Sequence, residues 1–259
     1  MNNKVPAVTL AFWVTKICAT TLGETAGDLL SMTLAVGYVA SSALLLVLFV
    51  ALLAGQLRSQ ACRPMLYWSV VLLTSTAGTT LSDCLNRTLA LGYARGALLL
   101  GVLLAATLLA WRVVDGRVAV DRVTTRRTEV FYWAAILCSN TLGTSLGDYL
   151  ADDSGLGFLG SAPLIGTLIL ALAVMHRITR ANRVLLFWAA FVLTRPFGAT
   201  FGDLLTKPAA HGGLDLGTAG SSAVLLALLV AAIGWSTRKA PAAASLQLAN
   251  GARGHSGAG

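Results

Sequence analysis

The chain has 259 residues, of which 56% are hydrophobic and 12% are charged, and its mean hydropathy is +0.74. Soluble domains contain about 25% charged residues, so this composition excludes an ordinary soluble enzyme and favours a protein that crosses a membrane several times. The net charge of +8 does not indicate nucleic-acid binding, because the basic residues lie in loops between apolar segments rather than along one face.

Eight helices are predicted in chain order. Each is apolar and about 20 residues long, which is the length needed to cross a bilayer. They cover residues 8–30, 35–57, 65–86, 90–113, 129–150, 157–178, 184–205 and 214–236. The predicted fold is therefore an all-α, polytopic membrane protein with eight transmembrane helices.

A repeated pattern marks every odd-numbered helix. A Trp is followed 10 residues later by Gly, 12 later by Thr or Ser, 14 later by Gly or Ser, and 15 later by Asp. The four copies begin at Trp13, Trp68, Trp133 and Trp188 and end at Asp28, Asp83, Asp148 and Asp203. A repeat of about 55 residues holds one helical hairpin, so the chain is predicted to consist of four tandem hairpins.

Polar segments divide these repeats into two halves. Residues 1–113 contain repeats one and two, residues 129–236 contain repeats three and four, and residues 114–128 form a basic cytoplasmic linker between the halves. Residues 237–259 include a stretch rich in Ala, Gly and Ser, and this segment is predicted to be a disordered cytoplasmic tail.

Basic residues predict the orientation, because the loops after the even-numbered helices contain most of them. These residues are Arg58, Arg63, Arg112, Arg117, Arg122, Arg126, Arg127, Arg177, Arg180, Arg183, Arg238 and Lys239. By the positive-inside rule, these loops and both termini are predicted to be cytoplasmic. Each repeat has two spans, so all four enter the membrane in the same direction. This parallel arrangement predicts a pseudo-twofold axis along the membrane normal, with approximate fourfold character.

A candidate site follows from the helical spacing of the repeat. Positions 8, 12 and 15 after each Trp share one helix face, as Thr21, Thr25 and Asp28 do in repeat one. The hydroxyl residues at position 12 are Thr25, Thr80, Ser145 and Thr200. Hydroxyl and carboxylate oxygens suit hard cations, so four converging stripes predict a site for Mg²⁺, Mn²⁺, Ca²⁺ or an alkali ion, or a proton relay.

The depth of this site follows from the helical rise. Each Trp lies near the cytoplasmic boundary, where indole rings prefer to lie. The Asp is about 22 Å further along the helix, which places the carboxylates nearer the outer face than the midplane.

Three charged residues break the repeat inside the predicted spans. Glu24 occurs only in repeat one and precedes Asp28 by four residues, so two carboxylates neighbour each other on one helix. Lys16 and Arg195 replace uncharged residues of the other repeats. Because a charge inside a membrane is costly unless it is paired, both are predicted to be counter-ions to Glu24 and one or more of the aspartates.

The same residues also have purely structural explanations. An Asp at the end of a helix, before a tight turn, often caps the next segment. Small residues spaced by four are typical of close helix packing in lipid. Lys16 is near enough to the cytoplasmic boundary to extend its ammonium group to the interface.

The complete pattern resembles a bacterial family of integral membrane proteins built from four copies of a repeat of unknown function. The resemblance covers about residues 10–236 and rests on the Gly-x-Thr/Ser-x-Gly/Ser-Asp ending and on an aromatic residue before each Trp. These aromatic pairs are Phe12-Trp13, Tyr67-Trp68, Tyr132-Trp133 and Phe187-Trp188. The resemblance implies a bacterial inner-membrane location and points to the four Trp and four Asp as the family's residues. Repeat four departs from the pattern at Pro196 and in its longer outer loop.

Three hypotheses on function follow. The first is a transporter or exporter of a hard cation, including exchange for protons, and the second is a transporter of a small organic or anionic solute held by Arg195 and Lys16. The third is a non-transporting membrane scaffold or sensor. The sequence contains no nucleophile–base pattern and no cofactor motif, so neither an enzyme nor a cofactor is predicted. The predicted partners are the lipid bilayer and a small ion or solute, without nucleic acid, and a homo-oligomer is compatible with the sequence.

Overall fold

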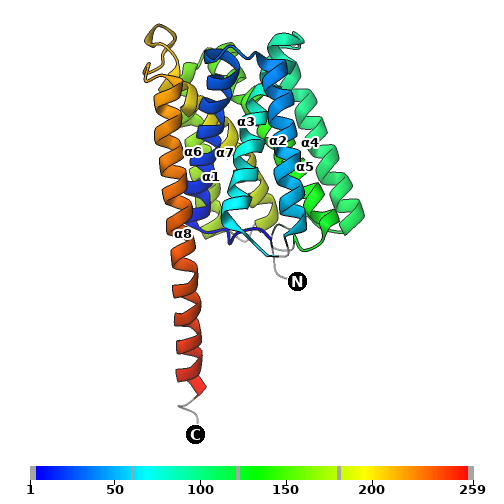
Figure 1. Cartoon of the computed structure of the whole chain (residues 1–259), viewed down its shortest axis with the longest axis vertical. Coiled ribbons are helices and arrows are strands. Elements are labelled where there is room, and N and C mark those ends of the chain that lie inside the picture. Colours follow the sequence, from blue (N-terminus) through cyan, green and yellow to red (C-terminus); the bar gives the residue numbers. More distant parts are fainter. Residues whose placement is uncertain (1–3, 60, 119, 121–122, 180–181, 256–259) are drawn as a thin grey trace.

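The computed structural model describes residues 4–59, 61–118, 120, 123–179 and 182–255, with side chains described as far as residue 237. Within these residues the chain forms eight α-helices and no β-strand. The helices stand side by side as a bundle, and the far end of α8 projects from it (Figure 1). The all-helical prediction is confirmed. Arg122 and Arg180 of the predicted basic loops lie outside the described residues.

The helix boundaries lie close to the predicted ones. The bounds are α1 Leu10–Asp28, α2 Tyr38–Arg58, α3 Pro64–Asp83, α4 Tyr93–Asp115, α5 Arg126–Asp148, α6 Gly157–Ile178, α7 Arg183–Thr206 and α8 Thr218–His255. Each Asp of the repeat pattern is the last residue of its α-helix or lies within the last turn of it. All four aspartates therefore lie at the same end of the bundle.

Among the residues that the structure describes, five helices are long and apolar enough to cross a membrane, namely α2, α4, α6, α7 and residues Thr218–Thr237 of α8. Helices α1, α3 and α5 are more polar because they contain the hydroxyl and charged residues of the repeat. Their polar residues are mostly buried, whereas the even-numbered helices expose many large aliphatic side chains. The apolar surface and the polar interior indicate a membrane protein.

The odd-numbered helices form a closed inner ring, with contacts between α1 and α3, α3 and α5, α5 and α7, and α7 and α1. Each even-numbered helix packs outside, on the odd helix of the next repeat: α2 on α3, α4 on α5, α6 on α7, and α8 on α1. The contact between α8 and α1 closes the circle. The outer helix of each hairpin thus covers the inner helix of the next hairpin around the ring. No repeat can therefore bury its polar inner helix alone.

Close contacts within the ring are made by the first Gly of each copy. A Cβ atom built on Gly23, Gly78, Gly143 or Gly198 would lie 3.0 Å or less from an atom of the residue seven positions after the Trp of the next repeat. Those residues are Ser75, Asn140, Arg195 and Thr20, in the same order. The packing explanation of these glycines therefore holds, since any larger residue would push two inner helices apart.

Aromatic side chains close the end of the ring opposite the aspartates. The aromatic residue before each Trp contacts the Trp of the next repeat, and the ring centroids lie 5.3–6.4 Å apart around the circle. The pairs are Phe12–Trp68, Tyr67–Trp133, Tyr132–Trp188 and Phe187–Trp13. Trp68, Trp133 and Trp188 are buried. The sequence alone had suggested that these indoles lie at the membrane boundary. In the structure, the three buried indoles pack against the other aromatic residues of the ring instead.

The turn after the aspartates repeats as well. A π-helical turn follows α1, α3 and α5, at η1 Leu29–Thr33, η2 Cys84–Thr88 and η4 Tyr149–Asp153. Each of these turns is followed by a residue with positive φ, namely Ala35, Ala90 and Gly155. Asp215 is the corresponding residue with positive φ in repeat four. In repeat four the π-helical turn is replaced by a longer loop that contains Lys207 and the short 3₁₀ helix η5 Ala209–His211. Repeat four thus departs where the sequence differs.

The C-terminal segment differs from its prediction. Residues 238–255, expected to be part of a disordered tail, continue helix α8 to His255. Six of its 18 residues are alanine, and the high helix propensity of alanine favours propagation of the preceding helix into this stretch.

Candidate ion-binding site

The centre of the ring is lined by one stripe from each inner helix, at positions 3, 7, 11 and 15 after the Trp. From α1 it consists of Lys16, Thr20, Glu24 and Asp28, and from α3 of Val71, Ser75, Thr79 and Asp83. From α5 it consists of Ile136, Asn140, Thr144 and Asp148, and from α7 of Phe191, Arg195, Ala199 and Asp203. All sixteen residues are buried. A spacing of four residues keeps each stripe on one helix face.

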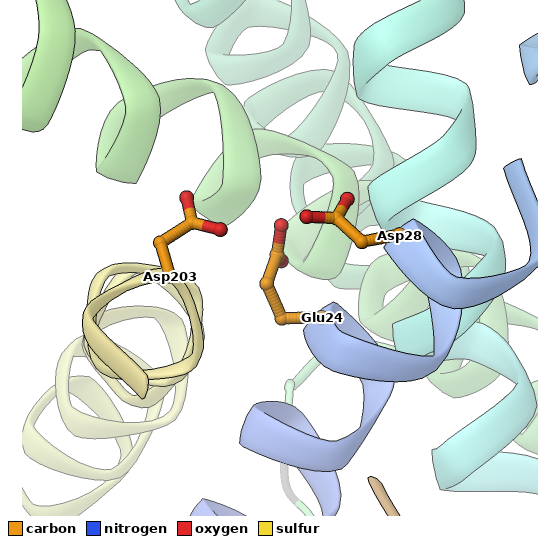
Figure 2. Close-up of side chains that lie close together, drawn as sticks. All are labelled: Glu24, Asp28 and Asp203. Atoms are coloured by element: carbon orange, nitrogen blue, oxygen red, sulfur yellow. The ribbon is translucent and has the colours of Figure 1, made fainter. Parts of the chain in front are cut away.

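Three carboxylates meet at the aspartate end of this ring. Glu24 and Asp28 from α1 and Asp203 from α7 have oxygen atoms within 4.8 Å of one another, and all three side chains are buried. Figure 2 shows them pointing toward a common space between the two helices. Carboxylate oxygens at such distances suit a hard cation, and the group contains no thiolate or imidazole that would favour zinc or copper.

A lysine from repeat four lies at this carboxylate cluster. The Nζ atom of Lys207 donates to Oδ2 of Asp28 at 2.6 Å and lies 3.3 Å from Oδ1 of Asp203. The Asp203 contact is an ion pair without a hydrogen bond. Burial opposes the charged ammonium, but Asp203 and Asp28 outweigh it and hold the pKa of Lys207 well above its usual value. Lys207 therefore already supplies one positive charge of the chain itself to this cluster.

An arginine blocks the centre of the ring one layer further in. Nη2 of Arg195 lies 2.8 Å from Oε2 of Glu24 and 2.5 Å from the hydroxyl of Thr79. The guanidinium also donates to the carbonyl oxygens of Thr20 and Ser75. Arg195 starts on α7 and thus reaches α1 and the opposite helix α3, so its side chain fills the axis. The predicted pairing of Arg195 with Glu24 is present.

Lys16 is placed differently from its predicted role. Its side chain is 0% exposed, so it does not extend to the membrane interface. Nζ donates to Oδ1 of Asn140 on the opposite helix at 3.3 Å and lies 4.2 Å from the ring centroid of Phe191. Among the described residues, Lys16 has no ion pair with a carboxylate. It fills the layer between Arg195 and the aromatic end.

The two remaining aspartates have unequal surroundings. Asp83 is paired with Arg87, whose Nε lies 2.8 Å from its Oδ1. Asp148 is buried, with 4% of its surface exposed, and it has no ion pair and no hydrogen bond to its side chain within the part of the chain that the structure describes. The four equivalent positions therefore comprise two aspartates that share Lys207, one with its own arginine, and one without a partner.

The repeated hydroxyls bond to neighbouring helices or to the backbone of their own helix rather than to the carboxylate cluster. The hydroxyl of Thr25 accepts a hydrogen bond from Ser222 of α8, and that of Ser145 lies 2.7 Å from the hydroxyl of Ser82 on α3. Thr80 and Thr200 donate to carbonyl oxygens of their own helices. The structure thus brings the aspartates and Glu24 together and leaves these four hydroxyls to helix packing.

The aspartates do not cap the turns that follow them. Asp28, Asp83 and Asp148 each precede a π-helical turn, and none of their side chains accepts a capping hydrogen bond from it. Asp28 and Asp83 instead bind the cations described above. The carboxylates of Asp28 and Asp83 are therefore directed to charged side chains and not to backbone donors.

Sequence reasoning missed Lys207 and Arg87 as partners of the aspartates. Both lie four residues after a repeated Asp, which is the spacing of a helical ion pair. That spacing was the available signal. The bridge from Lys207 to Asp28 had no signal in the sequence, because it depends on the packing of α7 against α1 where the ring closes.

Comparison with known proteins gives one match. The model of a family described as Repeat of Unknown Function (DUF347) matches four consecutive segments, residues 11–61, 66–116, 131–182 and 186–240. Each segment covers most of one odd helix and most or all of the even helix that follows it. Neither a curated protein nor a solved structure matches the chain.

Proposed function

The chain belongs to the Repeat of Unknown Function (DUF347) family, and from this premise we propose that it transports a hard cation across a membrane. The observation that supports this proposal is the cluster of Glu24, Asp28 and Asp203, whose oxygen atoms lie within 4.8 Å of one another. The cluster lies inside the inner ring, which the apolar outer helices surround. Buried ionisable groups in a membrane bundle commonly mark the path of an ion.

The proposed topology has eight transmembrane helices in four parallel hairpins. Helices α1, α3 and α5 cross the membrane inside the ring, where the outer helices shield their polar residues from lipid. We place the protein in the inner membrane of a bacterium, with both termini in the cytoplasm. The basic loops lie on the same side of the bundle as the termini, and basic loops favour the cytoplasmic side. The carboxylate cluster then faces the outside.

The proposed path begins at this outer end. An entering cation exchanges with the ammonium group of Lys207 at Asp28 and Asp203 and reaches Glu24. The pair of Arg195 and Glu24 obstructs further movement, because its guanidinium is bonded to both α1 and α3. Passage therefore requires this pair to separate, and a cation at Glu24 favours separation by competing with Arg195 for the carboxylate.

The alternative of an anionic solute has less support. Both Nη atoms of Arg195 are already bonded to groups of the chain, and only Nε lacks a hydrogen-bond partner. Lys16 lies beyond Arg195 as seen from the aspartate end and is fully buried. A solute arriving from that end would have to displace several internal contacts before either basic residue could hold it.

Ion flux in reconstituted liposomes tests the proposal. Uptake of Mg²⁺, Mn²⁺, Ca²⁺, Na⁺ and K⁺ is measured for the wild type, Asp28→Asn, Asp203→Asn and the matched control Asp152→Asn, which removes an exposed carboxylate at the same end. We expect flux of at least one cation to fall about tenfold or more in the two cluster variants, equivalent to ~1.4 kcal/mol, and to persist in the control. Undiminished flux in Asp28→Asn and Asp203→Asn would overturn the assignment.

A further inference from the structure

The four aspartates of the ring differ in the residue that follows each by four positions. That residue is Met32 in repeat one, Arg87 in repeat two, Asp152 in repeat three and Lys207 in repeat four. Repeats two and four therefore supply their own cation, and repeats one and three do not. This alternation follows the twofold relation between the halves of the chain.

The two halves use their cation differently. Lys207 reaches from Asp203 of repeat four to Asp28 of repeat one, so it serves both aspartates. Arg87 would play the same part between Asp83 and Asp148, but it is paired with Asp83 alone. Its guanidinium lies over the ring of Tyr93, 5.7 Å from the centroid, and its ion pair is with Asp83 rather than with Asp148. Asp148 is left without a partner as a result.

The charges around Asp148 are mostly negative. Asp83 on α3, Asp203 on α7 and Glu24 on α1 are all near enough to repel a carboxylate there, and Arg87 attracts it. Tyr93 of α4 and Asp152 of η4 belong to the same group of interacting residues. Asp83 is already neutralised by Arg87 and Asp203 by Lys207. Arg87, the cation that acts on Asp148, is therefore already paired with Asp83. Lys16 lies in another layer of the ring, beyond Arg195.

An isolated ionised carboxylate in such a place is strongly unfavourable. Burial without a partner costs several kcal/mol or more for a charged group, and a buried acid escapes this cost by taking up a proton. When several carboxylates share a small space, one of them holds a proton while the others ionise. Asp148 is the member of the ring with neither a counter-ion nor a hydrogen bond to stabilise its anion.

We infer that Asp148 is the proton-binding site of the ring, separate from the carboxylate cluster of Glu24, Asp28 and Asp203 that binds the cation. This assignment rests on the proposed transport function for its role in coupling, but the protonation itself does not. A cation that binds at the cluster reduces the negative potential around Asp148 and so favours release of its proton. A cation enters the ring as a proton leaves, which is the requirement for exchange.

Infrared spectroscopy of the purified full-length protein tests the protonation directly. A protonated carboxyl group has a C=O stretching band that an ionised carboxylate lacks. At neutral pH we expect this band in the wild type and in Asp152→Asn, which removes an exposed carboxylate, and its loss in Asp148→Asn. A wild type without the band, or an Asp148→Asn variant that retains it at full intensity, would refute the inference.

Thermal unfolding and flux separate this inference from the proposed function. Asn imitates a neutral carboxyl group, so Asp148→Asn should keep the wild-type unfolding midpoint. If Asp148 were ionised and stabilised the fold, the midpoint of the variant would be lower.

In liposomes, an imposed pH gradient should accelerate cation uptake by the wild type and by Asp152→Asn, but not by Asp148→Asn. If Asp148→Asn loses the infrared band but the wild type shows no cation flux, the proton-binding site is supported and the transport function is rejected. Equal acceleration in Asp148→Asn would reject the coupling role.

Discussion

Arg195 and Glu24 meet at the centre of the inner ring, with Nη2 of one 2.8 Å from Oε2 of the other. The two residues come from the last and first inner helices, and their side chains are 0% and 4% exposed. Neither has a charged counterpart in the other repeats. Their pairing joins the ends of the repeat array at one point, so the closed ring is stabilised by an ion pair that only this ring permits.

Breaking that pair should destabilise the protein strongly. Arg195→Met leaves Glu24 as a buried carboxylate without its counter-ion, which typically costs about 3–5 kcal/mol. The double variant Arg195→Met with Glu24→Gln should recover much of the loss, because no charge is then left unpaired. Thermal unfolding in detergent measures both. If the double variant is as unstable as the sum of the single variants, the pair has no coupling energy and this explanation is wrong.

Lys16→Met should have a much smaller effect than Arg195→Met. Lys16 is fully buried, but its contacts are an amide oxygen and an aromatic ring, and no carboxylate depends on it. Met has a similar shape and removes the cost of burying an amine, so the unfolding midpoint should stay the same or rise. A loss comparable to that of Arg195→Met would show that Lys16 balances an acidic group after all.

Lys207→Met should make the protein respond to added divalent cations. The variant leaves Asp28 and Asp203 without their shared ammonium, so its unfolding midpoint in metal-free buffer should fall. Millimolar Mg²⁺, Mn²⁺ or Ca²⁺ should then raise the midpoint more than it does in the wild type, because a bound ion stabilises the folded state. Arg87→Met is the matched control, because Arg87 pairs with Asp83 outside the cluster. An equal response in both variants would argue against a cation site at the cluster.

The Lys207 bridge should persist in alkaline solution. Its raised pKa means that the stabilisation is complete below the ordinary pKa of lysine and is lost only as the pH rises through the higher value of the folded state. The difference in midpoint between wild type and Lys207→Met should therefore be the same at neutral pH and at about pH 10, near the ordinary lysine pKa. A difference that disappears over this interval would mean that the bridge is much weaker than its geometry indicates.

The packing of inner helices predicts a contrast between two glycines. In Gly78→Ala the new Cβ would lie 3.0 Å from backbone atoms of Asn140 and Thr141 on α5, so the helices must separate at a cost of about 1–3 kcal/mol. Gly101→Ala on the outer helix α4 meets nothing within 4 Å and should be neutral or slightly stabilising. Midpoints measured side by side test this, and equal midpoints would contradict the close contact.

Closure of the ring by α8 can be tested by cross-linking. Ser222 donates a hydrogen bond to the hydroxyl of Thr25 at 2.8 Å, so cysteines at these two positions should form a disulfide. The four native cysteines are first replaced by alanine, since all of them are free thiols. Thr25→Cys with Ser42→Cys is the control, because α2 packs on α3 and not on α1. Cross-linking of the control pair, or none in the test pair, would contradict the packing of each outer helix on the inner helix of the next hairpin.

The sequence alone determined the helices and the repeat. Apolar segments of about 20 residues predict helices in lipid, and the recurrence of Trp and Asp at fixed spacing places all four carboxylates at one end of the bundle. These are local properties, because helix formation and the register of a residue within a helix depend on neighbours three or four positions away. The charges that break the repeat could be recognised as exceptional for the same reason.

Which helix faces meet and which charges pair depends on how the helices pack against one another. The position of Asp28 on its helix borders two faces: one contains Thr25, and the other contains Glu24 and Thr20. Sequence spacing favoured the first, but close packing of the inner helices at their glycines turns the second toward the axis and leaves Thr25 to α8. The closure of α7 on α1 then brings Lys207 to Asp28 and Arg195 to Glu24. Such pairings depend on the rotation of each helix and on its neighbour in the ring, neither of which is a local property of the chain.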